Sequence, residues 1–132
     1  IEQELGIKTF LENDSNAMAY GEFANGIVTN EKNVLFINLD YGTGSGIIVD
    51  GKVYYGKSGF SGEFGHIPFY DNEIICGCGK KGCLETEVSG QALLRKVKEK
   101  MEAGAATILT KKKDELKLED LIEAAKQEDV LM

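Results

Sequence analysis

The sequence has no apolar run long enough to span a membrane and no signal peptide among its first residues. It also lacks an excess of positive charge, because 15 Lys and Arg stand against 22 Asp and Glu, which gives a net charge of −7. Segments that bind nucleic acid carry a basic face. We therefore expect this segment to contact neither a membrane nor nucleic acid, and a reducing cytoplasm is the expected location.

Histidine and cysteine are scarce, but the few that are present lie close together. The one histidine and the three cysteines fall within one stretch, at His66, Cys76, Cys78 and Cys83. One imidazole and three thiolates complete a tetrahedral zinc shell, and soft thiolates disfavour magnesium and calcium. Because such a shell has no open position, the pattern predicts a structural zinc ion rather than a catalytic one.

The cysteines have two other interpretations: a disulfide with one spare thiol, or small buried apolar side chains. A disulfide between Cys76 and Cys78 would close a very small, strained ring, and an odd number of cysteines fits a secreted framework poorly. Three glycines between Cys76 and Cys83 leave the backbone free to wrap around an ion. The whole pattern therefore favours zinc, and we interpret its loop as a device that orients the flanking carboxylates of Glu63 and Glu85.

The length of the chain suits one compact domain. We expect a single partial domain over residues 1–132, with a strand-rich core and the zinc loop in residues 1–88 and a helical segment in residues 89–132. The ends look cut, because there is no initiator methionine and no closing element after the second helical pattern. The chain is therefore expected to be a piece of a larger protein.

Near the N-terminus, residues 7–11 are predicted to form a buried strand, and a polar cluster follows it. A helix is predicted over residues 17–24, with one of the residues 14–16 as its N-cap. The pair Asn13-Asp14 has two interpretations, which both stay open at this point. It can be simply a cap and turn, or it can bind a ligand, because α/β folds keep ligand groups at the carboxyl ends of strands.

The middle of the chain is rich in β-forming residues. Strands are predicted over residues 34–41, 47–49 and 52–55. Asp50-Gly51 separates the last two, and an Asp-Gly pair between two such runs is a strong hairpin signal.

A glycine-rich segment over residues 42–46 is predicted to be the turn between two neighbouring antiparallel strands. Its glycines can serve a tight hairpin alone, or its backbone N–H groups and the Thr43 hydroxyl can cradle a phosphate. It is not a P-loop, since no Lys-Ser/Thr pair follows, and it is not a Rossmann fingerprint, since no helix opens on it.

Two helices are predicted in the C-terminal part. Ser89 is the expected N-cap of a helix that runs to about Ala103, and a second helix is expected over residues 119–127. The apolar face of the first comprises Leu93, Leu94, Val97 and Met101, with Arg95, Lys96, Lys98 and Glu99 facing outward. The apolar face of the second comprises Leu118, Leu121, Ile122 and Ala125. The lysines at 111–113, between the helices, are interpreted as a solvated turn.

Three separate motifs occur along the chain. The first is the Glu-Asn-Asp run at residues 12–14, and the third is Cys-Gly-Cys-Gly-Lys-Lys-Gly-Cys-Leu-Glu at residues 76–85. The second runs from Leu39 to His66, with its glycines at Gly42, Gly44, Gly46, Gly56, Gly62 and Gly65. In this order and spacing, the motifs resemble those of the ROK family, named for repressors, open reading frames and kinases. The resemblance covers about residues 5–100.

The resemblance implies an α/β fold, as part of the second lobe of an actin-like ATPase (ribonuclease H-like) fold with a zinc-stapled loop. Family members are sugar kinases or sugar-responsive repressors. In the kinases, the residue that matches Asp14 is the general base that takes the proton from the attacking sugar hydroxyl. The loop that matches Gly42, Thr43 and Gly44 approaches the nucleotide phosphates.

The sugar contacts are also implied by the resemblance. Residues that match Asn13, Asp14, Glu63, His66 and Glu85 bind sugar hydroxyls, and His66 ligates zinc through its other nitrogen. Carboxylates and an amide suit this task, because each hydroxyl is both a donor and an acceptor.

The implied cofactors are a structural zinc ion and, for a kinase, ATP and Mg²⁺; the implied partners are a hexose or N-acylhexosamine and a second copy in a homodimer. The favoured function is ATP-dependent phosphorylation of such a sugar, and the alternative is the sugar-sensing domain of a repressor. A zinc-stapled binding module without turnover is a third interpretation. Because the first phosphate hairpin and the adenine-side helices of the family are absent, the segment alone is not expected to be a competent kinase.

Overall fold

The computed structural model describes residues 1–26, 28–111 and 113–132, and it divides the chain into two compact units. The first unit comprises residues 1–37 and 44–63, and the second comprises residues 38–43 and 64–132. Lys112, the middle lysine of the predicted solvated turn, lies outside the described residues. Among the described helices, none has both the length and the apolar character that a membrane crossing requires.

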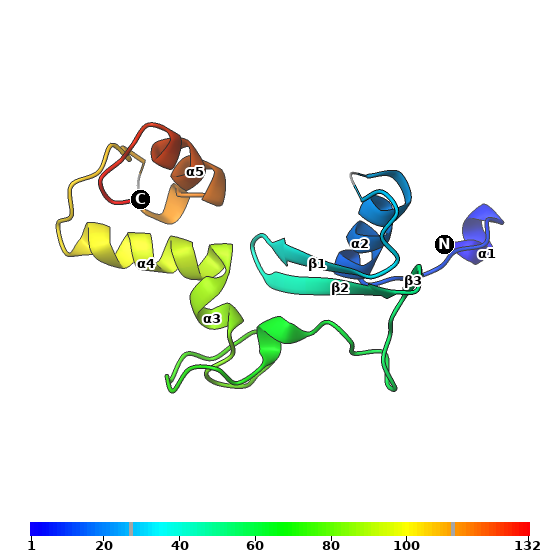
Figure 1. Cartoon of the computed structure of the whole chain (residues 1–132). Coiled ribbons are helices and arrows are strands. Elements are labelled where there is room, and N and C mark those ends of the chain that lie inside the picture. The colour runs from blue at the N-terminus through cyan, green and yellow to red at the C-terminus, as the bar shows by residue number, and fades with distance from the viewer. Residues whose placement is uncertain (27, 112) are drawn as a thin grey trace. The chain divides into compact units, whose positions relative to one another are not determined.

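A three-stranded sheet in the order β1-β2-β3 runs through the middle of the chain (Figure 1). Its strands are β1 (Val34–Leu39), β2 (Thr43–Val49) and β3 (Lys52–Val53). β2 pairs antiparallel with β3 across the turn at Asp50 and Gly51, which have positive φ angles of 50° and 76°. Positive φ at both central residues is typical of two-residue hairpins, and the predicted Asp-Gly hairpin is confirmed.

The segment predicted as a glycine-rich turn is mostly strand. The turn occupies residues 40–42, and β2 begins at Thr43, so Gly44 and Gly46 lie inside the strand. Helix α2 (Asp14–Asn25) explains why: a Cβ on Gly44 would lie 2.4 Å from Ser15 Oγ, and one on Gly46 would lie 2.4 Å from Ala19 Cβ. These glycines permit close packing of the strand against the helix, rather than a turn.

Two predictions near the N-terminus are wrong. Residues 7–11 form no strand, and Leu11 is fully exposed. Backbone N–H and C=O groups need partners to form a sheet, and none of the described strands pairs with this segment. It follows a short helix, α1 (Glu2–Leu5). Helix α2 begins three residues earlier than predicted, because Asn13 is its N-cap and accepts from Asn16 N at 3.1 Å.

The second unit contains three helices that follow the cysteine-rich segment. They are α3 (Glu85–Val88), α4 (Gly90–Glu102) and α5 (Leu118–Lys126), with short 3₁₀ turns, η1 and η2, at Phe64–His66 and Lys113–Glu115. Ser89 caps α4 by accepting from Ala92 N at 3.2 Å, as predicted.

The core of the second unit lies between α4 and α5 (Figure 1). Val97, Leu116 and Leu121 are buried there, and partly buried apolar side chains surround them: Leu94, Met101, Leu109 and Leu131. The apolar faces were predicted only in part, because Leu93 and Ile122 are 44% and 49% exposed. Ala124, not the predicted Ala125, is the buried alanine of α5.

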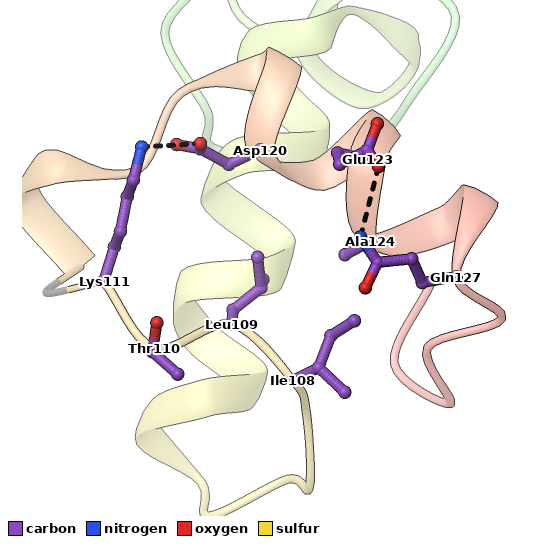
Figure 2. A pocket seen from close by; sticks show the side chains of 8 residues that line it. All are labelled: Ile108, Leu109, Thr110, Lys111, Asp120, Glu123, Ala124 and Gln127. Carbon is purple, nitrogen blue, oxygen red and sulfur yellow. Dashed lines mark hydrogen bonds and ion pairs between the residues drawn. The ribbon is translucent and has the colours of Figure 1, made fainter.

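Residues 108–111, which precede α5 in the sequence, lie beside this helix. A small hollow of about 190 Å³ lies between residues 108–111 and α5. Figure 2 shows the side chains that line it. An ion pair between Lys111 Nζ and Asp120 Oδ1 at 2.7 Å bridges one side of it. The hydrogen bond from Lys111 lowers the pKa of Asp120.

Candidate functional site

The predicted site residues fall into both units. Asn13, Asp14, Gly44 and Glu63 belong to the first unit. The second unit holds the rest: Gly42, Thr43, His66, Cys76, Cys78, Cys83 and Glu85.

In the first unit, Asn13 and Asp14 form the N-terminal end of α2. Asn13 Oδ1 is used to cap the helix, so the side-chain amide, Nδ2, is the group with which Asn13 can donate to a ligand. Asp14 Oδ1 accepts from Ser15 N at 2.7 Å and from Ser15 Oγ at 3.3 Å. This anchoring holds the orientation of the carboxylate, and Oδ2 has no hydrogen bond among the described residues.

The backbone beside Glu63 is held closely to β2. The Ser45 hydroxyl donates to Gly62 O at 2.8 Å, and Gly62 has a φ of 90°. A Cβ on Gly62 would lie 2.3 Å from Ser45 O, so no other residue fits this position without movement of the strand. The backbone from which the Glu63 side chain extends is therefore held in a fixed position within the first unit.

In the second unit, the histidine and the three cysteines converge. Their ligand atoms all lie within 4.8 Å of one another, with His66 Nδ1 3.4 Å from Cys76 Sγ and Cys78 Sγ 3.6 Å from Cys83 Sγ. In a tetrahedral zinc site with Zn–S of about 2.3 Å and Zn–N of about 2.0–2.1 Å, neighbouring ligand atoms are about 3.6–3.8 Å apart. The four side chains therefore fit a zinc ion, with Nδ1 as the histidine ligand.

The loop that carries the cysteines is held by its own backbone. Cys76 N donates to Lys80 O at 2.8 Å, and Gly79 N donates back to Cys76 O at 2.8 Å. Gly82 has a φ of 71°, and a Cβ there would lie 2.0 Å from Tyr70 O. Isolated bridges at Pro68–Cys83 and Ile75–Lys81 complete the loop. These contacts bring thiols that are apart in sequence to one point.

The thiols differ in their environments. All three are free cysteines, with Cys76 and Cys83 buried and Cys78 exposed. Burial raises the pKa of Cys76 to about 12 and raises the pKa of Cys83, whereas a backbone N–H from Lys80 lowers the pKa of Cys78. Two buried thiols with raised pKa values need a nearby cation to ionise at neutral pH, and a metal ion bound between them would supply it.

Glu85 joins this cluster to Thr43, the first residue of β2 after the turn. Its Oε2 accepts from Thr43 N at 2.9 Å, and its Oε1 lies 3.5 Å from Cys76 Sγ. A Cβ on Gly42 would lie 3.1 Å from Glu85 Oε2, so a bare backbone at Gly42 favours this approach. The Thr43 hydroxyl is buried and has no hydrogen-bond partner among the described residues.

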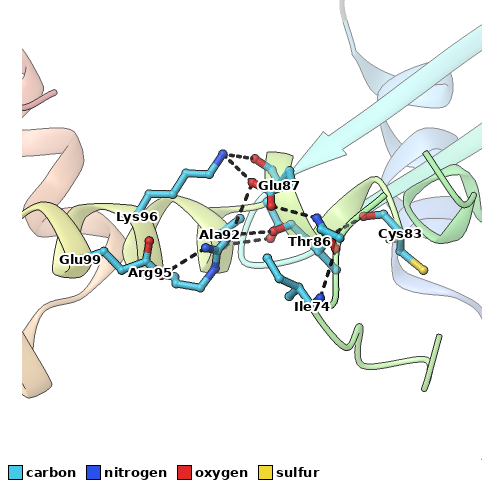
Figure 3. Close-up of polar contacts among 10 residues, drawn as sticks. Ile74, Cys83, Thr86, Glu87, Ala92, Arg95, Lys96 and Glu99 are labelled. Atoms are coloured by element: carbon cyan, nitrogen blue, oxygen red, sulfur yellow. Dashed lines mark hydrogen bonds and ion pairs between the residues drawn. The ribbon is translucent and has the colours of Figure 1, made fainter. Parts of the chain in front are cut away.

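A polar network joins the end of the cysteine loop to α4 (Figure 3). Thr86 Oγ1 donates to Cys83 O at 2.7 Å, and the Arg95 guanidinium donates to Thr86 O at 3.1 Å. Beside them, Lys96 Nζ forms an ion pair with Glu87 Oε2 at 2.8 Å. The hydrogen bond from Lys96 lowers the pKa of Glu87. Arg95 and Lys96 were predicted to face outward; instead they reach back to α3, which their helical spacing alone did not reveal.

Sequence reasoning also missed the surroundings of Glu12. Its carboxylate contacts Asn13, Asn16 and Tyr55. The Glu-Asn-Asp motif at residues 12–14 includes Glu12, but it predicted no function for this residue. No pattern in the sequence links Glu12 to Tyr55, which is 43 residues away.

Comparisons with known proteins agree with this arrangement. The model of the ROK family matches residues 1–131. A glucokinase of Streptomyces coelicolor is 41% identical over 103 residues, which are 78% of this chain and 32% of that protein. The xylose repressor of Bacillus subtilis is 39% identical over 100 residues, which are 76% of this chain and 26% of that protein. The chain thus spans no more than about a third of these relatives.

Among solved structures, a ROK family glucokinase from Streptomyces griseus in complex with glucose and AMPPNP matches 98% of this chain and 44% of its own, with 38% identity and a TM-score of 0.89. A ROK family transcriptional regulator that is a homologue of the E. coli MLC protein also matches, over 98% of this chain and 33% of its own, with 35% identity and a TM-score of 0.83. The structural neighbours thus include both sugar kinases with an actin-like ATPase fold and a regulator. The described elements form a small α/β part of that fold, so the predicted α/β class is confirmed.

Proposed function

Since the chain belongs to the ROK family, we propose that it forms the sugar-facing part of the second lobe in a protein that transfers a phosphoryl group from ATP to a hydroxyl of a hexose or N-acylhexosamine. The observation that carries this proposal is the match of nearly the whole chain to a glucokinase structure that holds glucose and AMPPNP. The remaining parts of such an enzyme would come from outside these residues.

Asp14 is the proposed general base. Its Oδ1 is anchored to the backbone and hydroxyl of Ser15, so Oδ2 would accept the proton as the sugar hydroxyl attacks the γ-phosphate. Phosphoryl transfer depends mainly on positioning and on neutralising charge. A positioned base typically contributes about 10²- to 10⁴-fold in rate.

The proposed sugar contacts use charged or strongly polar groups. Asn13 would donate through Nδ2, and Glu63 and Glu85 would accept from hydroxyls with their carboxylates. His66 would contact a hydroxyl through Nε2, because Nδ1 faces the cysteines. Gly42, Thr43 and Gly44 are the residues proposed to approach the phosphates of ATP, whose Mg²⁺ would offset their charge.

Zinc is the metal proposed for His66, Cys76, Cys78 and Cys83, where it would act as a structural staple. The donor set and the spacing of the ligand atoms support this assignment. Bound through Nδ1, the imidazole would be held neutral and in one tautomer. That state lets Nε2 donate a hydrogen bond to a sugar oxygen.

The cytoplasm is the proposed location and a homodimer the proposed assembly. The cytoplasm keeps free cysteines such as these reduced, and it supplies the ATP that the proposed reaction uses. The homodimer rests on the family resemblance alone.

A second candidate function is sugar sensing by a transcriptional repressor. The similarity to the Bacillus subtilis xylose repressor supports it, because that similarity covers most of the same residues as the similarity to glucokinase. In this case the same residues would bind the sugar, and binding would shift the equilibrium between two conformations of an attached DNA-binding domain.

The deciding experiment is ADP release by the full-length protein that contains this chain. ATP, Mg²⁺ and a panel of hexoses and N-acylhexosamines are supplied, with Asp14→Asn as the comparison. Sugar-dependent turnover that Asp14→Asn loses establishes the kinase and names its substrate. Absence of turnover, with sugar binding still measured by calorimetry, favours the sensor instead.

A further inference from the structure

The carboxylate of Glu12 joins three separate groups of the first unit. Oε1 accepts from Asn13 N at 2.8 Å and from Asn16 Nδ2 at 3.2 Å. Oε2 accepts from the Tyr55 hydroxyl at 2.5 Å. One side chain therefore connects the residue before the proposed base, the first turn of α2 and the segment after β3.

The Glu12 contacts act directly on the turn that presents Asn13 and Asp14. Asn13 has extended backbone angles, with φ −65° and ψ 140°, and its N–H is held by Glu12 while its side chain caps the helix. Asn16, which supplies the other contact to Oε1, is 96% buried, since only 4% of its surface is exposed. The carboxylate of Glu12 thus holds the backbone N–H before Asp14 and the side chain of Asn16 after it.

Tyr55 holds the other oxygen of Glu12 from a distant part of the sequence. The hydrogen bond from Tyr55, followed by those from Asn13 and Asn16, lowers the pKa of Glu12, and the same bond raises the pKa of Tyr55. Glu12 is therefore a charged acceptor, and hydrogen bonds to charged acceptors are stronger than those between neutral groups. Glu12 and Tyr55 line a hollow of about 670 Å³, and Tyr20 and Lys52 line it as well.

We propose that Glu12 is a positioning residue for the proposed phosphoryl transfer, and that Tyr55 fixes Glu12 in this role. Neither residue touches the reacting atoms in this proposal; Glu12 acts through the backbone N–H of Asn13 and the side chain of Asn16, on either side of Asp14. The inference rests on the proposed function, because the turn needs exact positioning only if Asp14 receives a proton from a bound sugar.

The test uses the full-length protein with Glu12→Ala, Glu12→Gln, Tyr55→Phe and the double variant Glu12→Gln/Tyr55→Phe. Tyr54→Phe is the matched control, because it removes the neighbouring tyrosine hydroxyl. Three quantities are measured: kcat and KM for the sugar, the melting temperature, and amide hydrogen exchange of residues 13–16.

We expect kcat to fall about tenfold in Glu12→Ala, which loses three hydrogen bonds, and about threefold in Tyr55→Phe, which loses one. A single lost hydrogen bond typically changes an equilibrium or rate by about 2- to 10-fold. Glu12→Gln should recover part of the loss, since an amide oxygen can still accept from Asn13 N. The double variant should lose less than the product of the two single losses, because both act through one contact. Exchange at residues 13–16 should become faster in Glu12→Ala and Tyr55→Phe, and Tyr54→Phe should match the parent.

The inference is overturned if exchange at residues 13–16 is unchanged in Glu12→Ala. It is also overturned if kcat is unchanged, or if the losses appear only in the melting temperature, as for a purely structural contact. If the parent phosphorylates no sugar and binds none, the proposed function fails by itself. Exchange then still decides whether Glu12 holds the turn, but the catalytic part of the inference fails with the function.

Discussion

The carboxylate of Glu85 accepts a hydrogen bond from the backbone N–H of Thr43 at 2.9 Å, across 42 residues of sequence. Its second oxygen lies 3.5 Å from Cys76 Sγ. The side chain thus connects the cysteine and histidine cluster with the first residue of β2, next to the turn at residues 40–42. This contact gives Glu85 two roles that substitutions can separate: support of the turn and, in the proposed function, binding of the sugar.

Glu85→Ala should lower both the melting temperature and the sugar affinity, whereas Glu85→Gln should lower mainly the affinity. The amide oxygen of glutamine can still accept from Thr43 N, but the charge that strengthens a hydrogen bond to a sugar hydroxyl is gone. Loss of a hydrogen bond to a charged group costs about 1.5–3 kcal/mol, so the dissociation constant should rise roughly 10- to 100-fold in Glu85→Ala.

Calorimetry with the preferred sugar and thermal unfolding of the full-length protein measure the two Glu85 effects. Glu73→Gln is the control, because Glu73 is exposed and pairs with Lys81 on the surface, away from Thr43. If Glu85→Ala binds the sugar as tightly as the parent, Glu85 does not belong to the sugar site.

Cys83→Ser should abolish stoichiometric zinc binding and lower the melting temperature by several degrees. Cys83 is completely buried, and its Sγ lies 3.6 Å from that of Cys78. Serine is nearly isosteric but is a poor zinc ligand, and the free energy of metal binding contributes directly to folding. Metal content is measured by mass spectrometry and stability by thermal unfolding.

Treatment of the parent with a chelator is the control for the Cys83 prediction. It should lower the melting temperature by about as much as the substitution does, and it should have no further effect on Cys83→Ser. Unchanged metal content and unchanged melting temperature in Cys83→Ser would show that the cluster holds no structural zinc.

Local signals in the sequence predicted the parts of the structure that depend on a few adjacent residues. The Asp50-Gly51 hairpin and the Ser89 cap are examples, since a turn or a cap is decided by one or two side chains and the backbone next to them. The convergence of His66 and the three cysteines was also predictable, because these are rare residue types that the chain collects in one segment.

The predictions that were wrong concern features that depend on residues distant in the sequence. Gly44 and Gly46 are glycines because α2 packs onto β2, and the sequence of the loop does not contain that information. Residues 7–11 have the composition of a strand, but a strand also needs a neighbour to pair with. Likewise, the contacts of Glu12 with Tyr55 and of Glu85 with Thr43 span 43 and 42 residues, and no periodicity predicts such pairs.

Gly46→Ala should destabilise the protein by about 1–3 kcal/mol, the range typical of overpacked sites. The new Cβ would lie 2.4 Å from Ala19 Cβ and 2.7 Å from Ser15 O, so α2 and β2 would have to separate. Gly21→Ala is a matched control on α2, because a Cβ there meets nothing within 4 Å.

The Gly21→Ala control should stabilise the protein by about 0.5–1 kcal/mol, since alanine favours a helix over glycine. Urea unfolding of both variants measures the two free energies. Equal stability of Gly46→Ala and the parent would contradict the close packing of α2 on β2.

Asp129 should make the free energy of unfolding depend on pH in the acid range. The backbone N–H of Ile108, then that of Leu131 and the hydroxyl of Thr107, hold its pKa below the usual value. Because the folded pKa is lower than the unfolded one, the stabilisation is fully present above the unfolded pKa, near 3.9. It is lost as the pH falls through the folded pKa.

The comparison of the parent with Asp129→Asn isolates the effect of Asp129. Asparagine cannot carry the charge that these three donors stabilise, so the variant should be less stable than the parent at pH 7. The difference should shrink between about pH 5 and pH 2, as the parent loses the contribution of its carboxylate. Urea unfolding across this range measures the difference, with Asp71→Asn, at an exposed aspartate, as the control. A constant difference between Asp129→Asn and the parent at every pH would show that the three donors do not favour the ionised form, whatever their contribution to packing.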